Sequence, residues 1–294
     1  MRHPLLPLVC AVSLLLAGVA GAAEPASKAE VERYARQLVE KTYPADGPGA
    51  AILVARGDEV LYRGARGRAS IELGVPLNAD QVFRMGSITK QMAAAGLLTL
   101  VEQGRLSLED PLSKFLPDYP GGGNVSVRML LNHTSGIKSY TSIPGVMEGP
   151  IRQDRTTAQM IETFKDLKPD FAPGQGYAYN NSGYVLVGAI IEKVSGQPWH
   201  AYLKQALFEP LGMRHTGYGL ESAGVIAGMV QGYTGEPGHP AKAGYLSMTQ
   251  PHAAGALVTT VDDLLRWNRA LHEGKVLKDA TYRQMITPTG KAID

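Results

Sequence analysis

The sequence predicts an α+β fold, and two kinds of local pattern support this prediction. Residues 51–55 and 59–63 are runs of β-prone side chains on either side of a short turn, which indicates a β-hairpin. In contrast, residues 88–101 carry apolar side chains around most of a helix, a pattern typical of a buried helix. A second apolar run, residues 185–194, follows a polar loop and predicts another helix.

The composition is that of an ordinary globular protein. Of the 294 residues, 44% are hydrophobic and 19% are charged, and the formal net charge is +2. The chain is long enough for one large domain or two small ones, and it lacks the basic excess that nucleic-acid binding needs. We therefore expect no nucleic acid among its partners. No motif indicates a metal ion or another cofactor, so none is expected.

Residues 1–22 have the features of a secretory signal peptide. A basic start precedes the apolar run 5–19, and the small residues that follow predict cleavage after Ala22 or Ala23. The run is too short for a transmembrane anchor, and no later stretch is long and apolar enough to span a bilayer. We therefore expect a periplasmic or secreted protein whose functional domain is residues 23–294.

The elements after the signal begin with a helix and the hairpin. Ser27 and Glu30 form a capping-box pattern, and apolar residues follow at helical spacing from Val31 to Val39. The hairpin turn contains Arg56-Gly57-Asp58. An adhesion signal would have the same letters, but a tight turn explains the triplet better, because short motifs have low specificity.

Ser87 and Lys90 are the first candidate catalytic residues. Gly86 suits the turn before the buried helix, so Ser87 would open the helix with Lys90 one turn further on, where the amine can reach the hydroxyl. A serine hydroxyl needs such a base to become a nucleophile. Keeping lysine neutral at pH 7 costs roughly 4.6 kcal/mol unless burial or a nearby cation lowers its pKa.

Chance is the competing explanation for this motif. Ser-x-x-Lys fixes only two residues, so it should occur about once in a chain of this length. It occurs a second time at Ser135 and Lys138, where Gly136 and the preceding His133-Thr134 indicate a turn.

The later segments provide a helix start and a second candidate site. Thr156 and Gln159 can form another capping box. The loop 173–184 is rich in turn residues and contains the only Tyr-x-Asn of the chain, Tyr179 and Asn181. Local hydrogen bonding in the turn is the alternative explanation for these polar side chains. His133 either touches the site or only ends a helix.

Taken in their order along the chain, these segments resemble the serine β-lactamase and penicillin-binding-protein superfamily, in particular its class C branch with the related esterases and peptidases. The likeness extends from about residue 28 to the end of the chain. It implies an antiparallel sheet flanked by helices, with a helical subdomain. The similar segments are residues 83–90, 131–136, 179–181, 211–213, 254–256 and 262–264.

The resemblance also implies roles for four residues. Ser87 would be the acylated nucleophile, Lys90 its proton partner, Tyr179 a general acid or base, and Asn181 a group that orients the substrate. A cationic Lys90 would favour a Tyr179 phenolate, whereas a neutral Lys90 would itself be the base. The sequence leaves these two arrangements open. The backbone N–H of Ser87, at a helix start, could supply one oxyanion donor.

The third motif of the superfamily is where this sequence departs from the pattern. That motif is Lys or His, then Thr or Ser, then Gly, on a late strand beside the nucleophile. His215-Thr216-Gly217 matches in letters but directly follows residues 211–213, where the family has a different segment. The chain ends at Asp294, about where the strands that carry the motif are expected to begin. The resemblance therefore implies a C-terminally incomplete domain with an unpartnered hairpin, low solubility and weak activity.

Two functions are compatible with these motifs. The first is a secreted serine hydrolase whose partner is a small-molecule or peptide substrate. It would cleave an amide or ester bond, in a β-lactam, a D-alanyl peptide or a small ester, through an acyl-enzyme on Ser87. The second is a non-catalytic relic or ligand-binding protein of the same fold, which the unmatched third motif favours.

Overall fold

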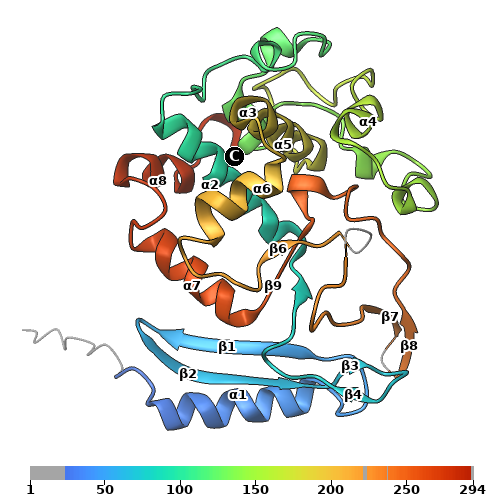
Figure 1. Ribbon diagram of the computed structural model, residues 1–294, viewed down its shortest axis with the longest axis vertical. Helices are drawn as coiled ribbons and strands as arrows, with labels where there is room; N and C mark the ends of the chain where they lie inside the picture. The colour runs from blue at the N-terminus through green and yellow to red at the C-terminus, as the bar shows by residue number, and fades with distance from the viewer. Residues whose placement is uncertain (1–23, 221–223, 237, 293–294) are drawn as a thin grey trace, which may run out of the picture.

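The computed structural model describes residues 24–220, 224–236 and 238–292. The predicted signal peptide, residues 1–22, and the only cysteine, Cys10, lie outside these ranges. In the described part, a layer formed by one helix and a hairpin lies below a larger helical part (Figure 1). No helix in these ranges is long and apolar enough to cross a membrane.

The lower layer is the predicted N-terminal helix and hairpin: α1 (Lys28–Thr42), β1 (Ala50–Arg56) and β2 (Glu59–Arg66). The capping box of Ser27 and Glu30 is confirmed at the start of α1. Gly57 has a positive φ of 55° in the hairpin turn, a conformation that glycine adopts without strain, so the triplet at 56–58 forms a turn as predicted. Helix α1 packs on the hairpin through a small apolar cluster: Ala35, Val39, Tyr43, Ile52, Val54 and Tyr62.

The helical part is built around two central helices, α2 (Thr89–Glu102) and α5 (Asn181–Ser195), which contact each other. Both are buried along most of their length, as the apolar pattern of the first predicts. Gly196 ends α5 in the left-handed conformation typical of a helix C-terminus. The surrounding α-helices are α3 (Val127–Leu131), α4 (Thr157–Glu162), α6 (Trp199–Leu203), α7 (Val261–His272) and α8 (Asp279–Ile286).

Short helical turns complete this part of the chain. A capping box between Thr156 and Gln159 opens α4, as predicted. The remaining turns are η1 (Gly86–Ile88), η2 (Leu112–Lys114), η3 (Gly122–Asn124), η4 (Tyr140–Ser142), η5 (Pro150–Arg152), the π-helix η6 (Lys204–Phe208), η8 (His252–Ala254) and η9 (Gly290–Ala292).

The β-structure consists of separate small antiparallel sheets. A three-stranded sheet has the order β5 (Phe83–Arg84), β9 (Leu257–Thr259), β6 (Gly217–Tyr218), so it joins the segment before Ser87 to two distant segments. Two more pairs are β3 (Arg68–Ser70) with β4 (Val75–Pro76), and β7 (Tyr233–Glu236) with β8 (His239–Lys242). Within the described ranges the hairpin pairs with no third strand, so the continuous sheet that the resemblance implies is not formed there. The expected C-terminal incompleteness stays a prediction.

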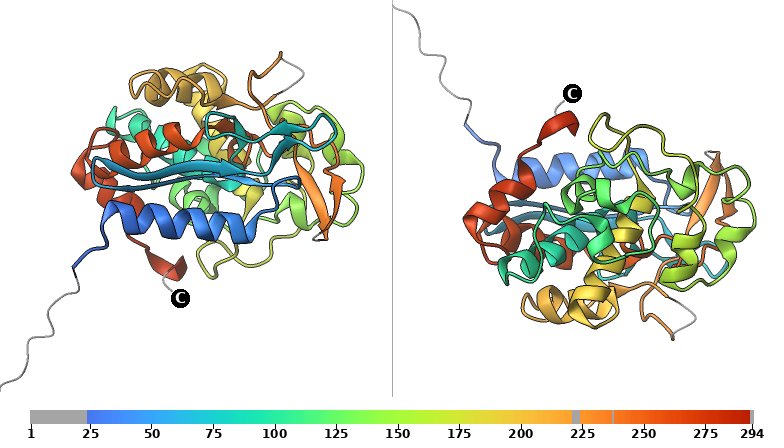
Figure 2. Two further views of the ribbon diagram at one scale, coloured as in Figure 1. Left: turned by 90° about the horizontal axis from the view of Figure 1, so that it is seen from below. Right: turned by 90° about the horizontal axis from the view of Figure 1, so that it is seen from above.

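Helix α7 covers the face of the hairpin opposite α1 (Figure 2). Its Arg269 donates two hydrogen bonds, of 3.0 and 2.7 Å, to the carbonyl of Gly57 in the hairpin turn. The layer therefore has α1 on one side and α7 on the other, and α7 connects the hairpin to the helical part.

The segment His215-Thr216-Gly217, which matches the third motif in letters, is held by a buried carboxylate of α7. Asp263 is 0% exposed and accepts hydrogen bonds from the backbone N–H of His215 (2.8 Å) and the hydroxyl of Thr216 (3.0 Å). Arg266 supplies the third bond (2.7 Å). These contacts give the segment a structural role in the packing of α7.

Asp263→Ala is expected to lower the free energy of unfolding by about 3 kcal/mol. The substitution leaves the part-buried N–H of His215 and the buried hydroxyl of Thr216 without their charged acceptor, which is costly. Urea unfolding at a constant m-value measures the effect. The adjacent Asp262, a half-exposed carboxylate paired with Arg63, is the control. Asp262→Ala should cost about 1 kcal/mol or less, and an equal loss in both variants would contradict the assignment.

Candidate active site

Ser87 lies in a tight turn between the small sheet and α2. The backbone N–H of Met85 donates to the carbonyl of Leu257 (3.1 Å), which fixes the chain as it leaves β5. Gly86 follows with a φ of 53°, a conformation that favours glycine. The α-helix begins at Thr89 rather than at the predicted Ser87, because residues 86–88 form a tighter 3₁₀ turn. The seryl side chain nevertheless lies next to the first turn of α2.

Lys90 is the buried cation of the site. Its side chain is 6% exposed, and burial lowers the pKa of its amine to about 8. The amine lies 2.9 Å from Asn181 Oδ1, 2.8 Å from the carbonyl oxygen of Ala254 and 3.3 Å from Ser87 Oγ. These three acceptors match the three protons of an ammonium group. A neutral amine would keep its two N–H bonds to Asn181 and Ala254 and direct its lone pair at Ser87.

Tyr179 is the second side chain in contact with Ser87. Its hydroxyl donates to Ser87 Oγ at 2.7 Å, and the Lys90 amine lies 4.7 Å from the centre of its ring. The side chain is 49% exposed, so it borders the solvent-facing edge of the site. Its position is set by the next residue, Asn180, whose side chain caps α5 by accepting from the N–H of Gly183 (2.8 Å).

Asn181, the first residue of α5, is held by contacts at both ends of its amide. Its oxygen accepts from Lys90, and its nitrogen donates to the hydroxyl of Thr141 (3.0 Å). Its backbone N–H donates to Ser139 Oγ (3.2 Å). The structure therefore brings together all four predicted site residues, Ser87, Lys90, Tyr179 and Asn181. Thr141 and Ser139 were missed because hydroxyl residues in a loop give no specific sequence signal.

His133 contacts the site, which is one of the two alternatives that the sequence left open. Its Nδ1 accepts from the backbone N–H of Asn180 (3.1 Å), and its ring lies 4.7 Å from that of Tyr179. Burial, together with the charge of Lys90, lowers the pKa of this imidazole to about 4. His133 is therefore neutral near pH 7 and supports Tyr179 by packing.

The second Ser-x-x-Lys forms no comparable pair. Ser135 is buried, and its hydroxyl accepts from the backbone N–H of Ile137 (3.4 Å). The amine of Lys138 binds Asp170 at 2.6 Å. Gly136 between them has a φ of 72°, so the turn that the sequence predicted is confirmed.

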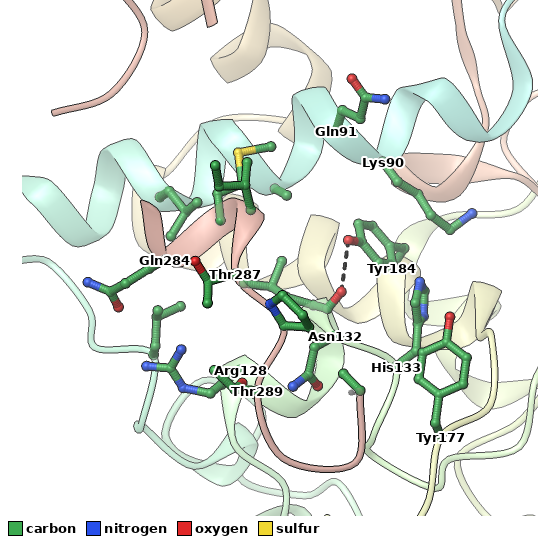
Figure 3. A pocket seen from close by; sticks show the side chains of 18 of the residues that line it. Lys90, Gln91, Arg128, Asn132, His133, Tyr177, Tyr184, Gln284, Thr287 and Thr289 are labelled. Carbon is green, nitrogen blue, oxygen red and sulfur yellow. Dashed lines mark hydrogen bonds between the residues drawn. The ribbon is translucent and has the colours of Figure 1, made fainter. Parts of the chain in front are cut away.

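Ser87 opens into a cavity of about 530 Å³ that runs along α2. Lys90, His133 and Tyr177 lie at one end, and Gln284 and Thr287 lie at the other (Figure 3). Between these ends the wall is largely apolar and includes Leu98, Leu108, Leu131, Met285 and Ile286. Within the described ranges, no group of three or more His, Cys, Asp or Glu side chains is placed to hold a metal ion.

This arrangement indicates a class of protein, the serine hydrolases. A serine hydroxyl in contact with a buried lysine amine and a tyrosine phenol, beside a cavity, has the neighbours that a nucleophilic serine needs. The comparison with family models agrees with this class, because the model described as Beta-lactamase matches residues 31–294. The chain belongs to the beta-lactamase family of serine hydrolases.

Individual relatives show how widely the family's members differ. The chain is 30% identical to a D-aminopeptidase of Gluconobacter oxydans, over 82% of this chain and 46% of that protein. It is 35% identical to esterase EstB of Burkholderia gladioli, over 58% of this chain and 47% of that protein. The chain thus spans about half the length of these curated relatives.

A solved structure supports the predicted fold. The D-amino acid amidase of Ochrobactrum anthropi SV3, complexed with D-phenylalanine, superposes with a TM-score of 0.73 at 27% identity. The match covers 87% of this chain and 72% of the amidase. The α+β fold of the β-lactamase and transpeptidase type is therefore confirmed.

Proposed function

We propose that this protein hydrolyses an amide or ester bond through an acyl-enzyme on Ser87. The observation that carries the proposal is the double contact of Ser87 Oγ, with the Tyr179 hydroxyl at 2.7 Å and the Lys90 amine at 3.3 Å. In this mechanism, Ser87 Oγ attacks the carbonyl carbon of the substrate while its proton passes to Lys90 or Tyr179. The tetrahedral intermediate then expels the amine or alcohol, which takes up that proton.

Water completes the cycle. A water molecule gives a proton to the same base, its oxygen attacks the acyl carbon, and the ester bond to Ser87 Oγ breaks as the seryl oxygen regains a proton. The backbone N–H of Ser87, in the turn that leads into α2, would stabilise the oxyanion in both steps. Asn181, fixed by Lys90 and Thr141, would orient the substrate.

The proposed substrates are small amides and esters with an apolar side group. The apolar wall of the cavity beside Ser87 favours such a group. The names of the relatives, a D-aminopeptidase, an esterase and a D-amino acid amidase, agree with this chemistry. β-Lactams and D-alanyl peptides contain the same reactive carbonyl and belong in the same panel of test substrates.

Intact mass spectrometry after treatment with a fluorophosphonate and a labelled penicillin tests the function. The expected result is one adduct on the protein, which peptide mapping places on Ser87. An amide and ester panel then identifies the substrate by turnover. Binding of these compounds without any adduct would favour the non-catalytic, ligand-binding alternative.

The pH dependence of kcat/KM should follow the titration of Lys90. Burial lowers the pKa of this amine to about 8, so the neutral base is scarce at pH 6 and predominant at pH 9. We expect kcat/KM to rise about tenfold per pH unit below pH 8 and to level off above it. His133, whose pKa lies near 4, stays neutral throughout. A flat profile from pH 6 to 9 would contradict a titrating lysine in the mechanism.

We also propose a periplasmic or secreted location. The proposal rests on the sequence of residues 1–22. N-terminal sequencing of the protein from a periplasmic extract tests it, and a mature chain that starts at Ala23 or Glu24 is expected. Recovery of the intact chain from the cytoplasm alone would contradict it.

A further inference from the structure

The carbonyl of Ala254, which accepts from Lys90, is presented by a closed turn at residues 251–255. The carbonyl of His252 accepts from the backbone N–H of Gly255 (3.1 Å) and from that of Ala256 (2.9 Å). The chain therefore turns tightly around Ala254, whose own carbonyl points to the Lys90 amine at 2.8 Å. The position of this acceptor depends on the conformation of His252.

That conformation is unusual. His252 has a φ of 48°, in the left-handed region that residues with a side chain seldom adopt. Such a backbone persists only where surrounding contacts hold it. The side chain of His252 is 3% exposed, its ring lies 5.2 Å from that of Trp199, and its Nε2 lies 3.0 Å from the Thr157 hydroxyl. The contacts of the ring therefore hold the turn.

Helix α5 leaves space for this ring at Gly188. A Cβ atom at that position would lie 2.5 Å from Cε1 and 2.7 Å from Nδ1 of His252, closer than real Cβ contacts. The imidazole thus fits between Thr157 of α4 and the glycine of α5. Helix α5 is buried along most of its length, and α4 is anchored to the core through the buried Met160, so the ring is held between two packed elements.

The two nitrogens of the ring have different surroundings. Nε2 lies 3.0 Å from the Thr157 hydroxyl, whereas Nδ1 is a buried nitrogen without a hydrogen-bond partner. Burial and the neighbouring His200 lower the pKa of His252 to about 3. The imidazole is neutral at working pH and does not carry protons for the reaction.

We propose that His252 is a positioning residue for the proton-transfer lysine. Its ring, held between Thr157 and Gly188, fixes the turn at 251–255 so that the Ala254 carbonyl binds one N–H of Lys90 and aims the amine at Ser87. This inference rests on the proposed function of Lys90. In this proposal, one buried histidine determines how the Lys90 amine is directed at Ser87.

The proposal has a measurable consequence for Lys90. If the turn moves, the ammonium form loses one of its three acceptors, so the pKa of Lys90 falls further. The neutral amine also loses an orienting bond, so its lone pair is aimed at Ser87 less often. The other titratable groups that face Lys90 are Tyr179, Tyr184 and His133, and none of them belongs to the turn at 251–255.

Two substitutions test the proposal without removing any titratable group. Gly188→Ala places a methyl group against the ring, on a helix where alanine is otherwise favoured. Thr157→Val removes the hydroxyl that holds Nε2. The control is Thr163→Val, at the residue that caps the other end of α4, where the hydroxyl donates to the carbonyl of Met160. A fourth variant, His252→Gln, keeps an N–H donor near the place of Nε2.

The first readout is the NMR titration of the lysine 15Nζ and 13Cε resonances, with Lys90 assigned by its loss in Lys90→Arg. In Gly188→Ala and Thr157→Val, we expect the midpoint of Lys90 to fall by at least about half a pH unit. We also expect kcat to fall about 10- to 100-fold with KM within twofold, since misplacement of about 1 Å in a catalytic group costs this much. Thr163→Val should match the wild type, and His252→Gln should lie between.

An unchanged Lys90 midpoint in both folded variants would overturn the proposal. A smaller fraction of active protein with wild-type kcat per active site would also overturn it, because a purely structural role predicts that result. The NMR titration needs no turnover. If the wild type proves inactive, the proposed function fails, while the effect of His252 on Lys90 is still decided by the midpoint.

Discussion

Ser87→Ala is expected to lower kcat/KM by at least about 10⁴-fold and to abolish the covalent adduct. Loss of the nucleophile removes the acyl-enzyme route, and substitutions of this kind in serine hydrolases have effects of this size or larger. The fold should be retained, because the Ser87 hydroxyl forms its bonds with the site residues Lys90 and Tyr179, and the methyl group of alanine fits the same turn. Steady-state kinetics and intact mass spectrometry measure the two effects.

Ser135→Ala is the matched control for this prediction. Ser135 belongs to the second Ser-x-x-Lys, but it is buried, and its hydroxyl accepts from the backbone N–H of Ile137 two residues on. We expect wild-type labelling and turnover, with at most a small loss of stability. An adduct that maps to Ser135, or one that persists in Ser87→Ala, would show that the nucleophile has been misassigned.

Tyr179→Phe is expected to lower kcat by about 10² to 10⁴-fold, the usual range for a general acid or base. The ring would keep its packing against His133, whereas the 2.7 Å bond to Ser87 would be lost. Lys90 remains in place, so the rising limb of the pH profile near pH 8 should persist if lysine is the base. If that limb disappears with the phenol, the base is Tyr179.

The exposed Tyr34 on α1 provides the comparison for this substitution. Tyr34→Phe removes a phenol from a surface helix outside the cavity and should leave kcat unchanged. If Tyr179→Phe retains full turnover as well, Tyr179 has no part in proton transfer.

Local features could be predicted from the sequence because their causes are local. The capping boxes at Ser27 and Thr156 depend on residues three positions apart, and both are present. The contact between Ser87 and Lys90 could be predicted from their spacing of three residues, because the 3₁₀ turn that leads into α2 also brings side chains three residues apart onto one face. Tyr179 and Asn181 joined the site only through the resemblance, since nothing in their own spacing indicates a distant partner.

The remaining features depend on contacts between distant segments. Ala254 serves Lys90 through a backbone carbonyl, which every residue type has, so no side-chain pattern indicates it. The positive φ of His252 arises from packing against two other helices. Likewise, His215-Thr216-Gly217 has the residue types of the third motif. In the structure, the N–H of His215 and the hydroxyl of Thr216 bind the carboxylate of Asp263 on α7. The short strands in separate sheets could not be predicted from β-propensity either, because the tendency of a residue to form a strand depends strongly on its neighbours in the fold.

The apolar cluster between α1 and the hairpin is separate from the main core in the part of the chain that the structure describes. Two cores imply two cooperative units, which can open with different free energies. The hairpin unit, with few buried side chains and a free strand edge, should undergo local opening more readily than α2 and α5. Ser87, Lys90 and Tyr179 belong to the helical unit. Local opening of the hairpin would therefore expose β1 to pairing with another molecule while the contacts among these three side chains are kept.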